Sequence, residues 1–565
     1  MPLQDVAQVV RALDDEFPEF SEAFASGQYS LWVGSAISRD VVPDLETLMT
    51  RVLELLRDNI DISVADCPFR AALEEVLEVA GLTDTVRDTI DFDEPVSSWT
   101  AREAIVRSVI DKYSDVLNIY PSGQDADYLV WTGLDVPNTY GDPALRPDAE
   151  HLSVGILMLE GIASTVQTTN WDGLIEAALE KLTPTAENVL RVVVTPEEFR
   201  KPTRRSDLVK FHGCAVRARE DENTYRPLLI ARRIQISGWT TRNVLMKEHL
   251  QHVYSTSPAL LVGLSAQDAN IHTVFNQAIE NLKRDWPSSP PAVVFANQHL
   301  DHHHKHVLQV TYGDDYVPND AAIKAASLLG AYAKPALAGL VLFALADKLR
   351  VLLRHVPELN VSTIPALTTD LLSLRDVVAV AAGTDERTFI EALIDVVRLA
   401  SHIFRKGQLP ETGMVPYEPI STRPIDDAIQ DVDFPKEALG RVALALALLS
   451  RARIKDSWKL GVGSCTNPGA GVLNIKTGSK ESKVFVVHDA REALALEMAG
   501  YTDADPDSTV LIQANAEPPR LTRSPRTRYG RTGRTQMRRV NMEDLAKTTF
   551  TVDELYEAFT LQGAF

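Results

Sequence analysis

Apolar residues recur along the chain with two different periods, which separate helical regions from sheet regions. In residues 44–60 and 101–113 they return every three or four positions, as on a helix with one buried face. Continuous runs of Val, Leu and Ile instead predict short buried strands. Such runs lie in residues 29–34, 161–169, 188–195, 207–213, 259–265 and 291–297.

Helix-patterned segments lie between most of these runs, and this alternation predicts an α/β fold. We expect a Rossmann-like parallel sheet with helices on both faces, because strands buried on both faces have continuous apolar sequences. The predicted organisation is a sheet domain at 1–318 with a helical insertion at about 43–150, a helical domain at 319–456 and a small α/β domain at 457–565. Amphipathic helices must bury one face, so we expect the helical domain to form a separate layer.

Composition and charge restrict the classes of function. The 565 residues include 57 basic and 78 acidic side chains, and the net charge of −21 argues against a general nucleic-acid binder. Three well-separated cysteines exclude a disulfide scaffold and a four-cysteine zinc site within one chain. The acidic first segment does not resemble a secretion signal, and the apolar run 335–346 is shorter than the roughly 20 residues of a membrane span. We therefore expect a cytoplasmic protein without a membrane partner, in which this run is a buried helix.

Small and polar residues follow five of the predicted strands. Ligands of open parallel sheets bind beyond the carboxyl ends of the strands, so these residues are candidates for one shared site. Each has a structural alternative as well: Asp172 could cap the next helix, and His212 could be a buried core histidine. The candidates are Gly34, Ser35, Ala36 and Ile37, then Asn170 and Asp172, then His212, then Gly263, Leu264 and Ser265, and finally Asn297.

In this order the motifs resemble the sirtuin (SIR2) family, in particular the bacterial SIR2-like NAD-hydrolysing domains of anti-phage defence proteins. The resemblance covers about residues 25–318. It is carried by Gly34-Ser35-Ala36-Ile37-Ser38 with Pro43-Asp44, Thr168-Thr169-Asn170-Trp171-Asp172, Lys210-Phe211-His212-Gly213, Gly263-Leu264-Ser265 and Asn297. The chain departs from deacetylating members: Leu45-Glu46 replace Phe-Arg, Ala36 and Thr169 replace a glycine and a glutamine, and the zinc-binding cysteines are missing.

The resemblance implies that NAD is the substrate, that no zinc is needed, and that Asn170 and His212 form the catalytic pair. Histidine titrates near neutral pH, so His212 suits a general base. The implied NAD-binding residues are Gly34, Ser35, Ala36, Ile37, Asp44, Thr168, Asp172, Gly263, Leu264, Ser265 and Asn297. The leading hypothesis is a regulated NAD glycohydrolase that depletes NAD in anti-phage defence. The alternatives are an NAD-dependent protein deacylase and a non-catalytic sensor or scaffold that binds NAD or another nucleotide.

Two further segments carry unusual side chains. Five histidines at 299, 302, 303, 304 and 306 invite a metal interpretation, but we expect a solvated loop and no metal. Residues 518–540 hold eight arginines, which fit either a solvated loop or a docking surface for nucleic acid, a nucleotide signal or an acidic protein. The resemblance also implies a homo-oligomer or a companion defence subunit, and we expect residues 456–565 to control activation or assembly.

Overall fold

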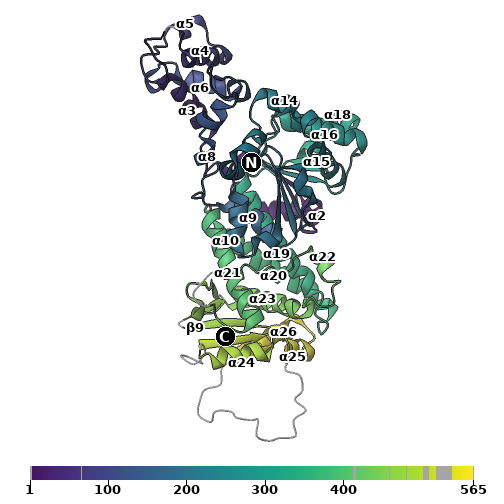
Figure 1. The fold of residues 1–565 in the computed structure, drawn as a ribbon. Coiled ribbons are helices and arrows are strands. Elements are labelled where there is room, and N and C mark those ends of the chain that lie inside the picture. Colours follow the sequence, from purple (N-terminus) through teal and green to yellow (C-terminus); the bar gives the residue numbers. More distant parts are fainter. Residues whose placement is uncertain are drawn as a thin grey trace.

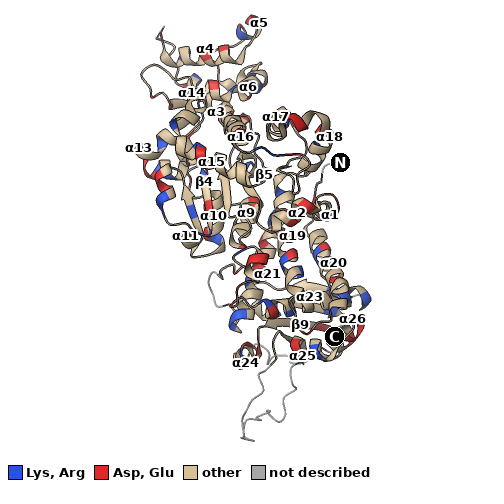
Figure 2. Ribbon diagram, turned by 90° about the vertical axis from the view of Figure 1, so that its right-hand side faces the viewer, with Lys and Arg blue, Asp and Glu red and all other residues tan. Residues whose placement is uncertain are grey.

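The computed structural model describes residues 3–563 apart from 65, 411–414, 457, 479, 501–507 and 517–537. Figure 1 shows an elongated molecule with a parallel sheet between two outer parts. Helices α3–α6 lie at one end, and a second sheet with α24–α26 lies at the other. Basic and acidic segments are interspersed along the same elements in Figure 2.

The first sheet has six parallel strands in the order β3-β4-β2-β1-β5-β6. Its central strand β1 pairs with β2 and β5, so that Val33 lies opposite Thr168 and Val262. The carboxyl ends of these three strands therefore lie at the same edge of the sheet. The strands are β1 (Ser30–Val33), β2 (Thr165–Thr168), β3 (Leu190–Val193), β4 (Ser206–Lys210), β5 (Ala259–Val262) and β6 (Val293–Ala296).

Helices cover both faces of this sheet, which confirms the predicted α/β fold class. Successive side chains of a strand point to opposite faces, and in β1 Leu31 and Val33 enter one core whereas Trp32 enters the other. The first core includes α1 (Val6–Asp15), α2 (Pro18–Ala25), α9 (Ala149–Leu159) and α10 (Leu174–Leu182). The second includes α14 (Arg233–Arg242), α15 (Val244–Thr256), α16 (Ala269–Asn281), α17 (His302–Tyr312) and α18 (Tyr316–Ser327).

A helical segment with its own core separates β1 from α9. Its main helices pack around buried residues such as Leu53, Leu73 and Val106. These helices are α3 (Leu45–Asp58), α4 (Pro68–Ala80), α5 (Asp84–Arg87), α6 (Arg102–Ile110), α7 (Tyr113–Val116) and α8 (Val136–Thr139). Short helices α11 (Ala186–Val189), α12 (Ala215–Glu220) and α13 (Glu222–Tyr225) join later elements of the sheet.

Part of the helical region after the first sheet shares the core of that sheet, and this part differs from the expected separate layer. Helix α19 (Ala333–Leu353) is buried around most of its circumference and shares one core with α1, α9 and the strands. The apolar run 335–346 is thus the buried helix predicted from its length. Long helices α20 (Ile364–Ala382), α21 (Glu386–Lys406) and α23 (Lys436–Asp456) and the short α22 (Ile425–Ala428) follow it. The three proposed domain boundaries remain predictions.

A smaller mixed sheet ends the described chain. Its strand order is β11-β10-β9-β8-β7, with β9, β10 and β11 parallel and β7 and β8 antiparallel to their neighbours. One face packs on α23 through Leu448, Val484 and Val510. The elements are β7 (Lys459–Val462), β8 (Leu473–Thr477), β9 (Lys480–Val487), α24 (Ala490–Met498), β10 (Thr509–Gln513), β11 (Arg538–Asn541), α25 (Met542–Thr548) and α26 (Val552–Gly563).

Four of the five histidines lie on helix α17, so the expectation of a solvated loop was wrong for them, whereas His299 precedes the helix. Asp301 caps α17 by accepting a hydrogen bond from the backbone N–H of His304 at 2.9 Å. His304 is buried, and its Nε2 lies 3.0 Å from the carbonyl oxygen of Leu264. Most of the arginine-rich segment, residues 517–537, lies outside the described residues, and residues 538–540 belong to β11. Among the described helices, none is long and apolar enough to cross a membrane.

Candidate active site

A cavity of about 560 Å³ lies where the loops after β1, β2, β4 and β5 meet, within the size range of ligand pockets. The helical insertion contributes a further part of the wall through Ile110, Tyr113 and Tyr140. Eight of the thirteen site residues predicted from the sequence line this cavity. They are Ser35, Ala36, Asp44, Asn170, Asp172, His212, Leu264 and Ser265.

The other five predicted residues are not in the lining of the cavity: Gly34, Ile37, Thr168, Gly263 and Asn297. Gly34 is needed for packing between two loops, because a Cβ there would lie 2.5 Å from the carbonyl oxygen of Gly263. Gly263 has a φ of +63°, and its carbonyl accepts a hydrogen bond from the Ala36 N–H at 3.2 Å. Asn297 follows β6, where its Oδ1 accepts from the N–H of Gln298.

Ser38 is the centre of a buried hydrogen-bond network. Its hydroxyl donates to Oδ2 of Asp172 at 2.9 Å, and it accepts from Nδ2 of Asn170 at 3.2 Å. The Nε2 atom of His151 lies 3.1 Å from the same hydroxyl oxygen. Oδ1 of Asn170 is buried and has no hydrogen-bond partner among the described residues. The amide of Asn170 is therefore held at its nitrogen, whereas its buried oxygen keeps an unused acceptor site.

Asp172 combines a structural and a site role. Its Oδ1 accepts from the backbone N–H of Leu174, the first residue of α10, at 3.1 Å, whereas its Oδ2 belongs to the Ser38 network. The N-cap residue of α10 is Gly173. Asp172 therefore supports the start of α10 and also takes part in the site network, so the two roles considered for it do not exclude each other. Lys210 also holds this turn. Its Nζ donates a hydrogen bond to the carbonyl oxygen of Asp172 and a second one, 2.9 Å long, to Oε1 of Glu176.

His212 is buried two residues after the end of β4 and lies against two polar side chains. Its Nε2 is 2.9 Å from Nδ2 of Asn270, and its Nδ1 is 3.9 Å from Oδ2 of Asp268. Burial lowers the pKa of His212 below the ordinary value of histidine, so the imidazole is neutral at neutral pH. With Asn270 donating to Nε2, the neutral ring carries its proton on Nδ1, toward the carboxylate of Asp268. This arrangement resembles that of a histidine whose ring is oriented by a carboxylate. A histidine held in this way is a common general base.

The helical insertion contacts the site directly. The Tyr113 hydroxyl at the start of α7 donates to Oδ1 of Asp268 at 2.8 Å, and burial raises the pKa of this phenol. Trp171, between Asn170 and Asp172, stacks edge-to-face on Tyr140 of the segment before α9, with ring centroids 5.4 Å apart. The indole of the turn therefore attaches the β2–α10 loop to the insertion.

Glu150, in the first turn of α9, is 4% exposed, and burial raises its pKa to about 8. A carboxyl group whose pKa is higher in the folded state than in the unfolded state stabilises the fold at pH values below its unfolded-state pKa. This stability is lost as the pH rises toward the folded-state pKa. One pKa unit corresponds to about 1.4 kcal/mol, so the loss at pH 7 is on the order of 3 kcal/mol. Glu150→Gln is expected to remove this loss, and urea unfolding at pH 5 and pH 8 measures it. Glu187→Gln, at an exposed carboxylate, is the control, and equal pH-dependence of Glu150→Gln and the parent contradicts the prediction.

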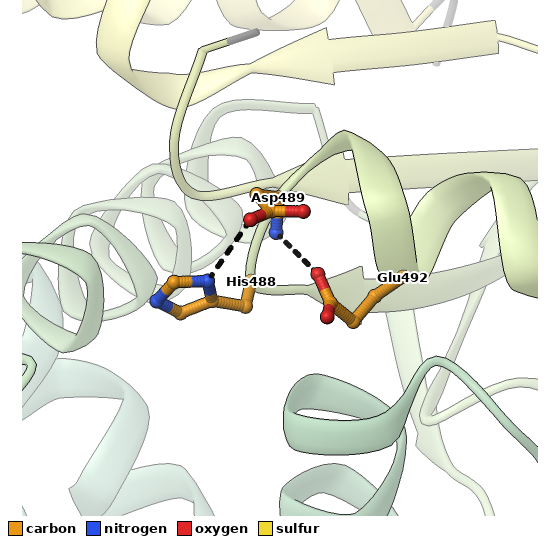
Figure 3. Close-up of side chains that lie close together, drawn as sticks. All are labelled: His488, Asp489 and Glu492. Carbon is orange, nitrogen blue, oxygen red and sulfur yellow. Dashed lines mark hydrogen bonds and ion pairs between the residues drawn. The ribbon is translucent and has the colours of Figure 1, made fainter. Parts of the chain in front are cut away.

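Two groups of side chains carry potential metal ligands. The described residues contain one cluster whose ligand atoms all lie within 4.8 Å, formed by His488, Asp489 and Glu492 (Figure 3). Asp489 caps α24, and Glu492 accepts from the Asp489 N–H at 3.2 Å, so both carboxylates serve the start of that helix. On α17, His306 lies near His272 with ring centroids 4.7 Å apart, and burial lowers the pKa of His272 to about 4.

The structure adds site residues that the sequence interpretation did not assign. Ser38 belongs to the Gly34–Ser38 motif, and Asp268 and Asn270 follow β5 a few residues after Ser265, so the strand-end argument could have included them. Tyr113 and His151 have no such signal, because they lie 155 and 113 residues from their partners Asp268 and Ser38. Only the fold brings them to the site.

Comparison with known families supports part of the resemblance. Residues 164–316 match the family model described as SIR2-like domain, which includes the loops after β2, β4, β5 and β6. The loop after β1 precedes the matched range. No curated protein matches the chain. Residues 164–316 are therefore similar to the SIR2-like family, and this similarity indicates an NAD-related activity.

Proposed function

We propose that this protein is an NAD glycohydrolase that cleaves the nicotinamide–ribose bond of NAD. One observation carries the proposal: Asn170, Asp172 and His212 line a single cavity at the carboxyl edge of a parallel sheet. The similarity of residues 164–316 to SIR2-like domains supports NAD as the substrate. Ser35, Ala36 and Ser265 would face the phosphates and adenosine, because small residues permit close approach of the backbone.

The proposed reaction breaks the bond between C1′ and the nicotinamide nitrogen, and the electron pair leaves with nicotinamide. The ribose gains oxocarbenium character, which the buried carboxylate of Asp172 stabilises. Oδ1 of Asn170 accepts a hydrogen bond from a ribose hydroxyl or from the attacking water. The water oxygen bonds to C1′, and its proton passes to His212, which accepts it at Nε2 in place of the Asn270 N–H. The products are nicotinamide and ADP-ribose.

We also propose that the enzyme is a regulated effector of anti-phage defence that acts by depleting NAD. An enzyme of this kind must be inactive at rest, because uncontrolled cleavage of NAD would kill the cell. The cavity wall includes residues from the insertion, and α19 shares the core of the sheet, so two other parts of the chain contact the catalytic unit. A homo-oligomer, a companion subunit or a ligand of the C-terminal part could act through either contact.

Asn170→Ala tests the proposed activity. Nicotinamide and ADP-ribose are measured by chromatography after incubation of the full-length protein with NAD, and total NAD is measured in cells that overexpress it. We expect the parent to release both products without any acyl-lysine peptide, and Asn170→Ala to lower the rate by about 100-fold or more. Asn138→Ala, at an exposed asparagine of the same region, is the matched control.

Two results would contradict the proposal. Nicotinamide release that requires an acyl-lysine peptide would identify a deacylase. Tight binding of NAD by calorimetry, with no product in vitro and no loss of NAD in overexpressing cells, would identify a sensor or scaffold.

A further inference from the structure

His151 lies in the first turn of α9 and is fully buried, but it is not part of the cavity wall. Its two ring nitrogens have separate partners. Nδ1 accepts a hydrogen bond from the backbone N–H of Asp148 at 3.2 Å, and Nε2 lies 3.1 Å from the hydroxyl oxygen of Ser38. The imidazole therefore connects the start of α9 to the loop after β1.

The Asp148 contact fixes the tautomer of this histidine. A backbone N–H can only donate, so Nδ1 of His151 must carry a lone pair. Burial lowers the pKa of His151, which keeps the ring neutral. The single ring proton therefore sits on Nε2 and is donated to Ser38.

This proton determines the orientation of the Ser38 hydroxyl. A serine oxygen accepts two hydrogen bonds and donates one. Ser38 accepts from His151 and from Nδ2 of Asn170, so its own proton must go to Oδ2 of Asp172. All its capacity is used, and the amide of Asn170 is held with its nitrogen toward Ser38 and its unpartnered oxygen free.

We propose that His151 is a positioning residue for cleavage of NAD, which acts through Ser38 to orient Asn170 and Asp172. This inference rests on the proposed function. Without the Nε2 proton, Ser38 has a vacant acceptor site and can rotate, and the amide of Asn170 can turn so that Oδ1 accepts from Ser38. Oδ1 is then lost to the substrate.

A double-mutant cycle tests the inference in the full-length protein. His151→Leu is expected to lower kcat by about 10- to 100-fold and to change KM by less, because a misplaced catalytic group costs up to about 100-fold. His151→Gln, whose amide nitrogen can replace the Nε2 donor, is expected to recover most of this loss. In a Ser38→Ala background, His151→Leu is expected to cause no further loss beyond about twofold.

Nitrogen NMR of the histidine rings provides a readout that does not depend on activity. The expected state of His151 is a neutral ring with its proton on Nε2. A proton on Nδ1, or a full effect of His151→Leu in the Ser38→Ala background, would overturn the proposal. If the parent cleaves no NAD, the proposed function fails, whereas the tautomer still decides whether His151 can orient Ser38. If His151→Leu does not fold, the rates of NAD cleavage by His151→Gln and by Ser38→Ala still test the proposal.

Discussion

Replacement of His212 by alanine is expected to lower the rate of the proposed NAD cleavage by about 10²- to 10⁴-fold, the range that general-base catalysis contributes. Affinity for NAD should change far less, because in the proposed reaction His212 acts on the proton that moves in the transition state. Burial lowers the pKa of His212. The neutral base is therefore present at neutral pH, and kcat/KM of the parent should fall only as the pH drops below the ordinary histidine range.

The pH profile separates a catalytic from a structural role of His212. In the parent, we expect protonation of His212 to cause the fall of kcat/KM at low pH. The residual rate of His212→Ala should not show this fall. His252→Ala, at an exposed histidine on α15, is the matched control and should retain both the rate and the pH profile. The assignment of His212 is wrong if His212→Ala, folded by circular dichroism, releases nicotinamide as fast as the parent.

The fold class could be predicted from the sequence because its signal is local. A strand such as Ser30–Val33 is buried on both faces and therefore has an uninterrupted apolar sequence, and a parallel sheet follows from the helices between such strands. The candidate site could be proposed for the same reason: residues that directly follow parallel strands meet at one edge. His212 and Asn170 were proposed in this way, and they line one cavity.

Contacts between distant segments could not be predicted from local patterns. The apolar sequence of α19 indicates burial but not its partners, which are α1, α9 and the strands of the first sheet. His151 lies on a helix that precedes β2, and only the register of β1 and β2 brings it to Ser38. The helix at His302–Tyr312 had a signal in Asp301 and the apolar spacing of Val307, Leu308 and Tyr312, but five histidines suggested a loop.

Lys348→Met is expected to lower the free energy of unfolding by about 3–5 kcal/mol, because it leaves a buried carboxylate without its cation. Lys348 of α19 and Glu160 at the end of α9 are each 1% exposed, and Nζ lies 2.7 Å from Oε2. Nζ also donates to the carbonyl oxygens of Glu160 and Ser421, at 2.6 and 3.1 Å. This ion pair joins the first sheet's helices to the C-terminal half.

Two further variants distinguish the loss of a buried ion pair from the loss of a lysine. Lys181→Met breaks a pair with Glu391 that is 45% and 40% exposed, and such surface pairs contribute at most about 1 kcal/mol. Adding Glu160→Gln to Lys348→Met removes the unpaired charge and keeps an acceptor for the hydroxyl of Tyr417, so it should restore part of the stability. Urea unfolding followed by fluorescence and circular dichroism measures all three. If α9 and α19 belonged to units that unfold independently, Lys348→Met would cost no more than Lys181→Met. A large loss, in contrast, requires that the first sheet with its helices and the C-terminal helices share one cooperative core.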